Sequence, residues 1–134
     1  MIEDKSMTVV ADGAASAGTA VNGTTIDTSD CEGVIFMGRI ATANAGNFIK
    51  VQEGDTTSPT TDLAGSAAIA TVDGQLIQIT VHKPLKRYLR TVTIRAGANT
   101  ATGDVIAVKY GIKKLAADGA AVDKYLVSPI AGTA

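Results

Sequence analysis

The sequence has few of the residues that most often carry catalytic chemistry or bind flat ligands. Its 134 residues include no tryptophan, two phenylalanines, three tyrosines, one histidine and one cysteine. A single cysteine excludes an intrachain disulfide, and one histidine with one cysteine cannot form an ordinary His/Cys zinc site. Five aromatic rings leave little for the stacking platforms that bind bases or sugars. We therefore expect no metal and no cofactor.

Long apolar runs are absent as well. No stretch reaches the roughly 18 uninterrupted apolar residues needed to cross a bilayer. The first ten residues, MIEDKSMTVV, lack the basic-then-apolar order of a signal peptide. We therefore expect no membrane partner, and the single cysteine allows synthesis in the cytosol.

Charge is nearly balanced overall but unevenly distributed along the chain. The net charge is −1, yet residues 1–73 carry −7 and residues 74–134 carry +6, with no acidic residue between Asp73 and Asp104. A near-neutral chain is poorly suited to free nucleic acid, so we expect no nucleic-acid partner. Two interpretations of the asymmetry remain. Either it serves contacts with protein surfaces of opposite sign, or the two halves interleave in the fold and neutralise each other.

The hydrophobic pattern predicts an all-β protein built from antiparallel strands. Residues 75–112 hold the best period-two signal, as three β-type runs joined by two turn-rich links. Residues 33–41 (GVIFMGRIA) are apolar on both faces, which is typical of a central strand. Within this run Gly38 predicts a bulge or a close backbone approach. The next run, at 47–53, predicts a half-buried strand joined to it by a hairpin loop at 41–46.

We predict a single domain over residues 1–134, an antiparallel, jelly-roll-like β-sandwich with extended terminal arms. Residues 1–25 are assigned to a first strand at 7–11 followed by a flexible loop or arm over 12–25, which is small and nearly uncharged. Residues 26–112 form the predicted core. Residues 113–134 are small and polar with isolated apolar residues, and they predict a C-terminal arm that packs onto a neighbour.

Positive charge is concentrated in the stretch HKPLKRYLR, which follows the strand predicted at 75–81. Its basic residues are Lys83, Lys86, Arg87 and Arg90. They form either a positive rim that faces an acidic partner or a solvated hairpin end that keeps the sheet edge soluble.

No residue pattern indicates catalysis, so we expect a protein that is not an enzyme. His82 is the only histidine and lies at a strand end beside Lys83. The acidic residues of the turn DTSDCE, at 27–32, are interpreted as solvated turn residues, with a calcium site as the alternative. The glycines of residues 97–104 lack the order of a phosphate-binding loop.

Several segments together resemble a known family. In chain order they are SDCEGVIFMGRI, NFIKVQEGD, TDLAG, HKPLKRYLRTVTI, GDVIAVKYGIKK and LVSPIAGTA. Over roughly residues 26–134 this order resembles small virion proteins of tailed bacteriophages, and among them the head-decoration, or cement, proteins. The resemblance implies a β-sandwich or jelly-roll-like fold, often trimeric, on the outer capsid where subunits meet. It supplies no residue-level binding motif.

We therefore expect a structural protein that binds the outer surface of an assembled capsid and stabilises it by bridging capsid subunits. Its expected partners are the major capsid protein and other copies of itself as a homotrimer. Its expected location is the virion, after synthesis in the bacterial host cytoplasm. Predicted partner-binding residues are Lys83, Lys86, Arg87 and Arg90 in the basic stretch and Tyr125, Leu126, Val127 and Ile130 in the C-terminal arm. The alternatives are a tail-tube or head-completion protein, or a virion module that binds a glycan or another ligand.

Overall fold

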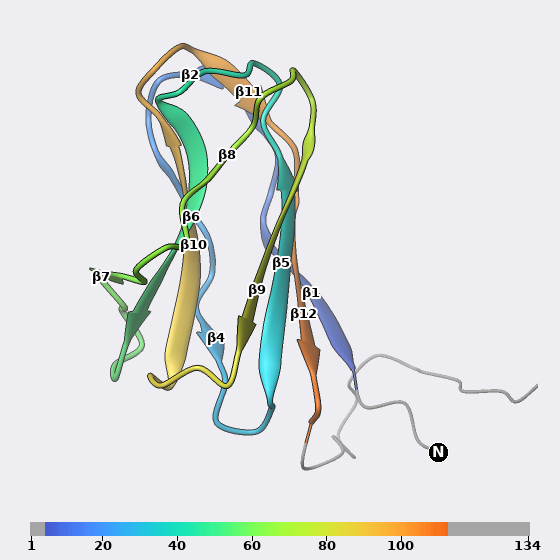
Figure 1. Cartoon of the computed structure of the whole chain (residues 1–134), viewed down its shortest axis with the longest axis vertical. Coiled ribbons are helices and arrows are strands. Elements are labelled where there is room, and N and C mark those ends of the chain that lie inside the picture. The colour runs from blue at the N-terminus through green and yellow to red at the C-terminus, as the bar shows by residue number, and fades with distance from the viewer. Residues whose placement is uncertain (1–4, 113–134) are drawn as a thin grey trace, which may run out of the picture.

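The computed structural model describes residues 5–112 of the chain, and this part contains strands and no helix (Figure 1). The predicted C-terminal arm and its four apolar residues lie outside the described residues. In chain order the strands are β1 (Ser6–Ala11), β2 (Ala14–Ala17), β3 (Val21–Asn22), β4 (Ile26–Asp27), β5 (Gly33–Arg39), β6 (Asn47–Gly54), β7 (Thr61–Asp62), β8 (Ala68–Ile69), β9 (Leu76–His82), β10 (Tyr88–Arg95), β11 (Thr100–Thr102) and β12 (Val105–Tyr110).

Ten of the strands form two facing antiparallel sheets with a jelly-roll topology, and β2 and β11 form a separate two-stranded sheet (Figure 1). One sheet has the order β1-β12-β5-β9. The other has the order β3-β10-β6-β7, in which β4 also pairs with β10 and β8 with β6. The pairs are nested along the chain, with the first strand beside the last and β5 beside β9, as when one long hairpin is rolled up. The predicted all-β, jelly-roll-like sandwich is confirmed.

This topology corrects two predicted hairpins. Residues 41–46 and residues 83–87 do not join paired neighbours, because β5 and β9 belong to one sheet and β6 and β10 to the other. Each link instead crosses from sheet to sheet at one end of the sandwich. We call the end that carries residues 28–32 and 83–87 the loop end. We call the opposite end, where β2 and β11 pair, the closed end (Figure 1).

The core lies between the sheets and is built from small apolar side chains around one phenylalanine. Phe36 is almost fully buried, and each well-buried aliphatic side chain contributes about 1.5–3 kcal/mol of transfer free energy. Gly38 follows on the same face, where a Cβ would lie 3.0 Å from Ile49 Cδ1. The predicted bulge is absent, because the strand register continues through Gly38. The groups that approach Gly38 closely are the side chains of Ile49 and Val105, and not the backbone as predicted. The main cluster contains Val10, Ile26, Cys31, Val34, Phe36, Val51, Val81, Leu89, Val105 and Ala107.

Residues 12–25 are not the loop or arm that the sequence predicted, since β2 pairs with β11 and β3 with β10. A buried guanidinium explains the difference. Arg95 is 4% exposed and donates hydrogen bonds to the backbone oxygens of Thr19 (2.6 Å), Ala15 (2.8 Å) and Thr100 (2.8 Å). A buried charge needs such partners, so Arg95 fixes the N-terminal segment against the closed end.

Asn47 makes a second polar connection at the closed end. Its side chain is fully buried, and its Nδ2 donates to the backbone oxygens of Thr42 and Ala98, both at 3.1 Å. Its Oδ1 accepts from the backbone N–H groups of Gly97 (3.1 Å) and Ala98 (3.2 Å). These four bonds satisfy the amide completely. They hold the β5–β6 link against the β10–β11 link.

Replacing Arg95 by methionine should destabilise the fold strongly. Arg95→Met removes the donor of the backbone oxygens of residues 15, 19 and 100, of which the bond to Thr100 is buried. We expect the free energy of unfolding to fall by about 2–4 kcal/mol, measured by urea unfolding. Arg39→Met, at an exposed arginine of β5, is the matched control and should change it by less than about 0.5 kcal/mol. Equal effects of the two substitutions would contradict the role of Arg95.

Candidate functional site: the loop end of the sandwich

Three of the four predicted basic residues, Lys83, Lys86 and Arg87, lie at the loop end, and Arg90 does not join them. Lys83 and Lys86 lie in the link between β9 and β10, Arg87 directly precedes β10, and Arg90 lies within β10. The link is tied to the β4–β5 loop by two backbone bonds, from Lys83 N to Glu32 O (2.6 Å) and from Thr28 N to Arg87 O (2.8 Å). The two loops therefore form one surface across both sheets.

The tip of the link exposes an unusual side chain. Leu85 is 96% exposed, more than any other large apolar residue between residues 5 and 112. Lys83 before it has a φ of +52°, a left-handed conformation that is uncommon for a residue with a side chain. This conformation turns the chain at the end of β9. In the sequence, Leu85 then stands between Lys83 and Lys86. An exposed leucine at a loop tip contributes nothing to the core.

Two of the basic side chains are neutralised within the chain. The Lys86 ammonium lies 3.2 Å from Asp55 Oδ2. The Arg87 guanidinium donates to both carboxylate oxygens of Asp27, at 3.1 and 2.9 Å. These hydrogen bonds, and to a lesser extent the guanidinium charge, hold the pKa of the Asp27 carboxyl well below its ordinary value of 3.8. The loop end is therefore a mixed-charge surface.

These pairs support the interpretation that the two halves of the chain interleave. Asp27 and Asp55 come from the acidic half, whereas Lys86 and Arg87 come from the basic half. A third pair repeats the pattern, with Lys109 Nζ 2.7 Å from Asp30 Oδ1. Charges that are segregated along the sequence are thus brought together in space.

Arg90 belongs to a different surface. It lies on the outer face of the second sheet, where its Nε donates to Gln52 Oε1 at 3.0 Å. Gln52 in turn donates to Asp62, and Asp62 accepts from Lys50 at 2.8 Å. Arg90 therefore holds β10 to β6 and β7, and it does not extend the loop tip.

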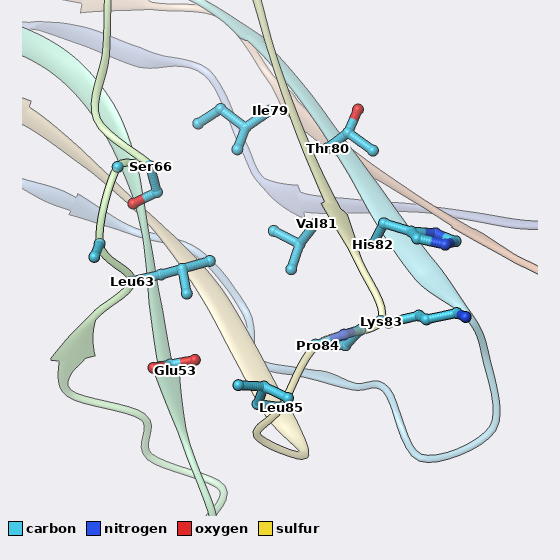
Figure 2. Close-up of a pocket in the computed structure, with 12 residues that line it drawn as sticks. Glu53, Leu63, Ser66, Ile79, Thr80, Val81, His82, Lys83, Pro84 and Leu85 are labelled. Atoms are coloured by element: carbon cyan, nitrogen blue, oxygen red, sulfur yellow. The ribbon is translucent and has the colours of Figure 1, made fainter.

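Two surface hollows flank the link. One has a volume of about 380 Å³ and is lined by apolar side chains that include Leu63, Ile79 and Val81. Figure 2 shows Ile79 and Val81 pointing from β9 into this hollow, while Thr80 and His82 point away from it. The other hollow, of about 610 Å³, lies between the link and the β4–β5 loop. Both are open, so they suit the side chains of a docked surface better than an enclosed small molecule.

His82 has a structural contact in this arrangement. Its ring stacks on that of Tyr110 with 5.8 Å between centroids, and His82 Nδ1 lies 2.7 Å from the Tyr110 hydroxyl oxygen. The two residues flank Gly33 across three strands, and a Cβ at Gly33 would collide with the tyrosine ring. The histidine thus ties β9 to β12 over the glycine of β5.

The acidic turn at 27–32 uses its aspartates for ion pairs. Asp27 pairs with Arg87 and Asp30 with Lys109, so these two acids remain partly exposed to solvent, as predicted, but are also ion-paired. Within residues 5–112, no three His, Cys, Asp or Glu side chains are grouped so that they could hold a metal ion. The same residues include no helix that is long and apolar enough to span a membrane.

Sequence reasoning missed Leu85 and the apolar hollow beside it. The leucine stands between two lysines in the stretch KPLK, and an apolar residue in a charged turn was an available signal. No pattern in the sequence indicates the hollow. Leu63 and Val81 are far apart in the sequence and meet only because β9 and the segment after β7 lie at the same side of the sandwich.

Comparison with known proteins gives a likeness in fold. No protein-family model matches the chain, and no curated protein sequence matches it. The SPBc2 prophage-derived protein YomS has a TM-score of 0.51 and 12% identity, over 81% of this chain and 95% of that chain. A xylan-binding module, CBM86, from Roseburia intestinalis has a TM-score of 0.43 and 15% identity, over 78% and 93%. A structure of Bacillus endospore appendages has 0.40 and 14%, over 84% and 92%. The likeness to YomS shows a shared fold.

The Asp27–Arg87 pair should make stability depend on pH in acid. The folded-state pKa of Asp27 lies below that of the unfolded chain, so the pair stabilises the fold above about pH 4 and this contribution is lost as the pH falls further. We expect Asp27→Asn to be less stable than the wild type at pH 7, with the difference shrinking between about pH 4 and pH 2. Urea unfolding at a series of pH values measures this.

The matched control for this experiment is Asp12→Asn, at an exposed aspartate that follows β1. It should run parallel to the wild type over the same range. A stability difference between wild type and Asp27→Asn that stays constant down to pH 2 would contradict the ion pair.

Proposed function

We propose that the chain is a structural component of a phage particle that binds the outer surface of the assembled capsid and stabilises it by bridging capsid subunits. Two observations support this proposal. The sequence segments described above resemble decoration proteins, and the jelly-roll fold is shared with a prophage-derived protein. The observation that carries the proposal is the exposed Leu85 between lysines, at the tip of a loop that is fixed to both sheets.

The loop end has the chemistry of a protein-docking surface. Leu85 supplies an apolar anchor, and the neighbouring hollow can accept an apolar side chain from the partner. No ion pair of the described residues involves Lys83, so its charge is available for an acidic partner group. Lys86 and Arg87 already have carboxylate partners and would contribute less. Because each of these two cations stands beside a carboxylate, the loop end also suits a partner surface of mixed charge.

The proposed partners are the major capsid protein and further copies of this chain, with the virion surface as the location. A symmetric trimer would multiply modest single-site contacts into high avidity, because the second and third sites bind at a high effective concentration. Tyr125, Leu126, Val127 and Ile130 are proposed as apolar anchors of the C-terminal segment. Non-covalent contacts are sufficient for this function, and it needs no cofactor.

The competing functions predict other binding behaviour. A tail-tube or head-completion protein would copurify with tails or portals rather than with shells. A glycan-binding module would be retained by a glycan array, although the described rings are few and Phe36 is buried in the core. Separation of virions into heads and tails, followed by immunodetection of the protein, distinguishes these cases.

A double substitution at the loop tip should weaken capsid binding. Lys83→Asn together with Leu85→Ser removes the exposed charge and the apolar anchor, and asparagine tolerates the left-handed backbone at position 83. We expect at least about tenfold weaker binding to purified capsids with little change in the free energy of unfolding. Cosedimentation with capsids at several salt concentrations measures the binding.

The matched control changes one cation and one apolar residue away from the loop tip. Arg39→Gln with Val72→Ser serves, because Arg39 and Val72 are both exposed and lie toward the closed end. This variant should bind as the wild type does. Equal binding of both double variants to capsids at every salt concentration would remove the loop tip from the proposed interface.

A further inference from the structure

The outer face of the sheet β1-β12-β5-β9 is apolar where a solvent-facing sheet surface is normally polar. Cross-strand register places its residues in two adjacent rows. Met7, Val108 and Ile35 form one row, which ends at Thr80, and Val9, Ile106 and Met37 form the next, which ends at Gln78. Neither row belongs to the two clusters of the core.

The exposure of this surface, which we call the outer apolar face, increases toward the edge of the sheet. Met7 is 71% exposed and Val9 is 51% exposed, both on β1. β1 pairs only with β12 among the described strands, so its other backbone edge is open as well, apart from the Val10 oxygen, which accepts from Thr24 N at 2.6 Å. An open edge beside an exposed apolar face is the usual condition for adding a chain segment from outside.

We propose that the C-terminal segment 113–134 of a neighbouring copy covers this outer apolar face and joins the copies into an oligomer. The segment follows β12, which is itself a central strand of the face. Four of its larger apolar residues, Tyr125, Leu126, Val127 and Ile130, are grouped after residues 113–124, which are mostly small or charged and include Leu115 and Val122. This inference deepens the proposed function, because it names the contact through which the copies would assemble.

The spacing of the segment favours a neighbouring copy over the same chain. The thirteen steps from Ile112 to Tyr125 can span up to about 45 Å when extended. The whole of β12 is six residues, or about 20 Å. A return onto the same sheet would need only a short turn, with the apolar group directly after it. A long spacer of mostly small and charged residues instead carries the apolar group beyond its own face.

Pairs of single-cysteine variants test the contact directly. Val9→Cys places a thiol on the outer apolar face, Leu126→Cys places one in the segment, and Val72→Cys is an exposed control away from the face. The native Cys31 should not interfere, because it is buried and burial raises the pKa of its thiol. Each pair of full-length variants is refolded together, one partner carrying a size tag, and then oxidised.

We expect a covalent heterodimer of V9C with L126C, at several-fold higher yield than that of V72C with L126C. No heterodimer, or a bridge that forms only within one chain carrying both V9C and L126C, would overturn the proposal. Dimers formed only between two V9C chains would also overturn it, because they would show that two outer apolar faces pack together. The experiment contains no capsid, so its failure is distinguishable from a failure of capsid binding.

A second measurement follows the oligomeric state by light scattering. A chain truncated after Lys114 should lose the oligomer and keep the unfolding transition of the sandwich. Val9→Glu should weaken association at least about tenfold in the full-length chain, because it places a charge within the buried contact. Val72→Glu should leave association unchanged. An oligomer that survives both the truncation and Val9→Glu would contradict the proposal.

Discussion

Strand β5 is apolar on both faces, and the rest of the structure depends on how these two faces are covered. Val34 and Phe36 point into the sandwich and are buried by the second sheet. Ile35 and Met37 point the other way, between the neighbouring side chains of β12 and β9. A jelly roll of two sheets can bury only the first pair. The second pair lies on a surface that this chain leaves partly open between residues 5 and 112, and this surface is the one on which the proposed assembly depends.

The two ends of the sandwich differ in what holds them. At the closed end, the buried side chain of Arg95 donates hydrogen bonds that fix the chain between β1 and β4. The buried side chain of Asn47 donates to and accepts from the backbone of the β5–β6 and β10–β11 links. At the loop end, Arg87 and Lys86 make ion pairs at partly exposed positions, and such pairs contribute little to stability. The loop end can therefore exchange its contacts for those of a partner at small cost, whereas the closed end serves as the rigid base.

The sequence predicted the fold class and most of the long strands, because period-two alternation is a local property. It could not predict which neighbours pair. The links at 41–46 and 83–87 look like hairpin turns locally, and only the nested topology sends each across the sandwich. The small residues at 12–25 were predicted to form a loop or arm. The buried guanidinium of Arg95, which fixes them, lies about 80 residues away in the chain and gives no local signal.

The candidate site was also only partly predictable from the sequence. The position of the basic stretch at one end of a strand was predictable. Its partial neutralisation by Asp27 and Asp55 was not, because it depends on loops from three strand connections. Ile106, Val108 and Tyr110 lie on one face of β12, and the structure turns that face away from the core. An apolar face normally indicates the interior, so only the register across β1, β12 and β5 shows that it faces outward.

The central claim is that this chain works as an assembled part of a particle, with its outer apolar face buried by a neighbouring copy. A cryo-electron microscopy map of virions that carry the protein tests it most directly. The account predicts density on the capsid shell in which β1 and β12 are covered by a chain segment that continues from β12 of the adjacent copy. Density that leaves this face open to solvent, or that places the protein away from the shell, would contradict it.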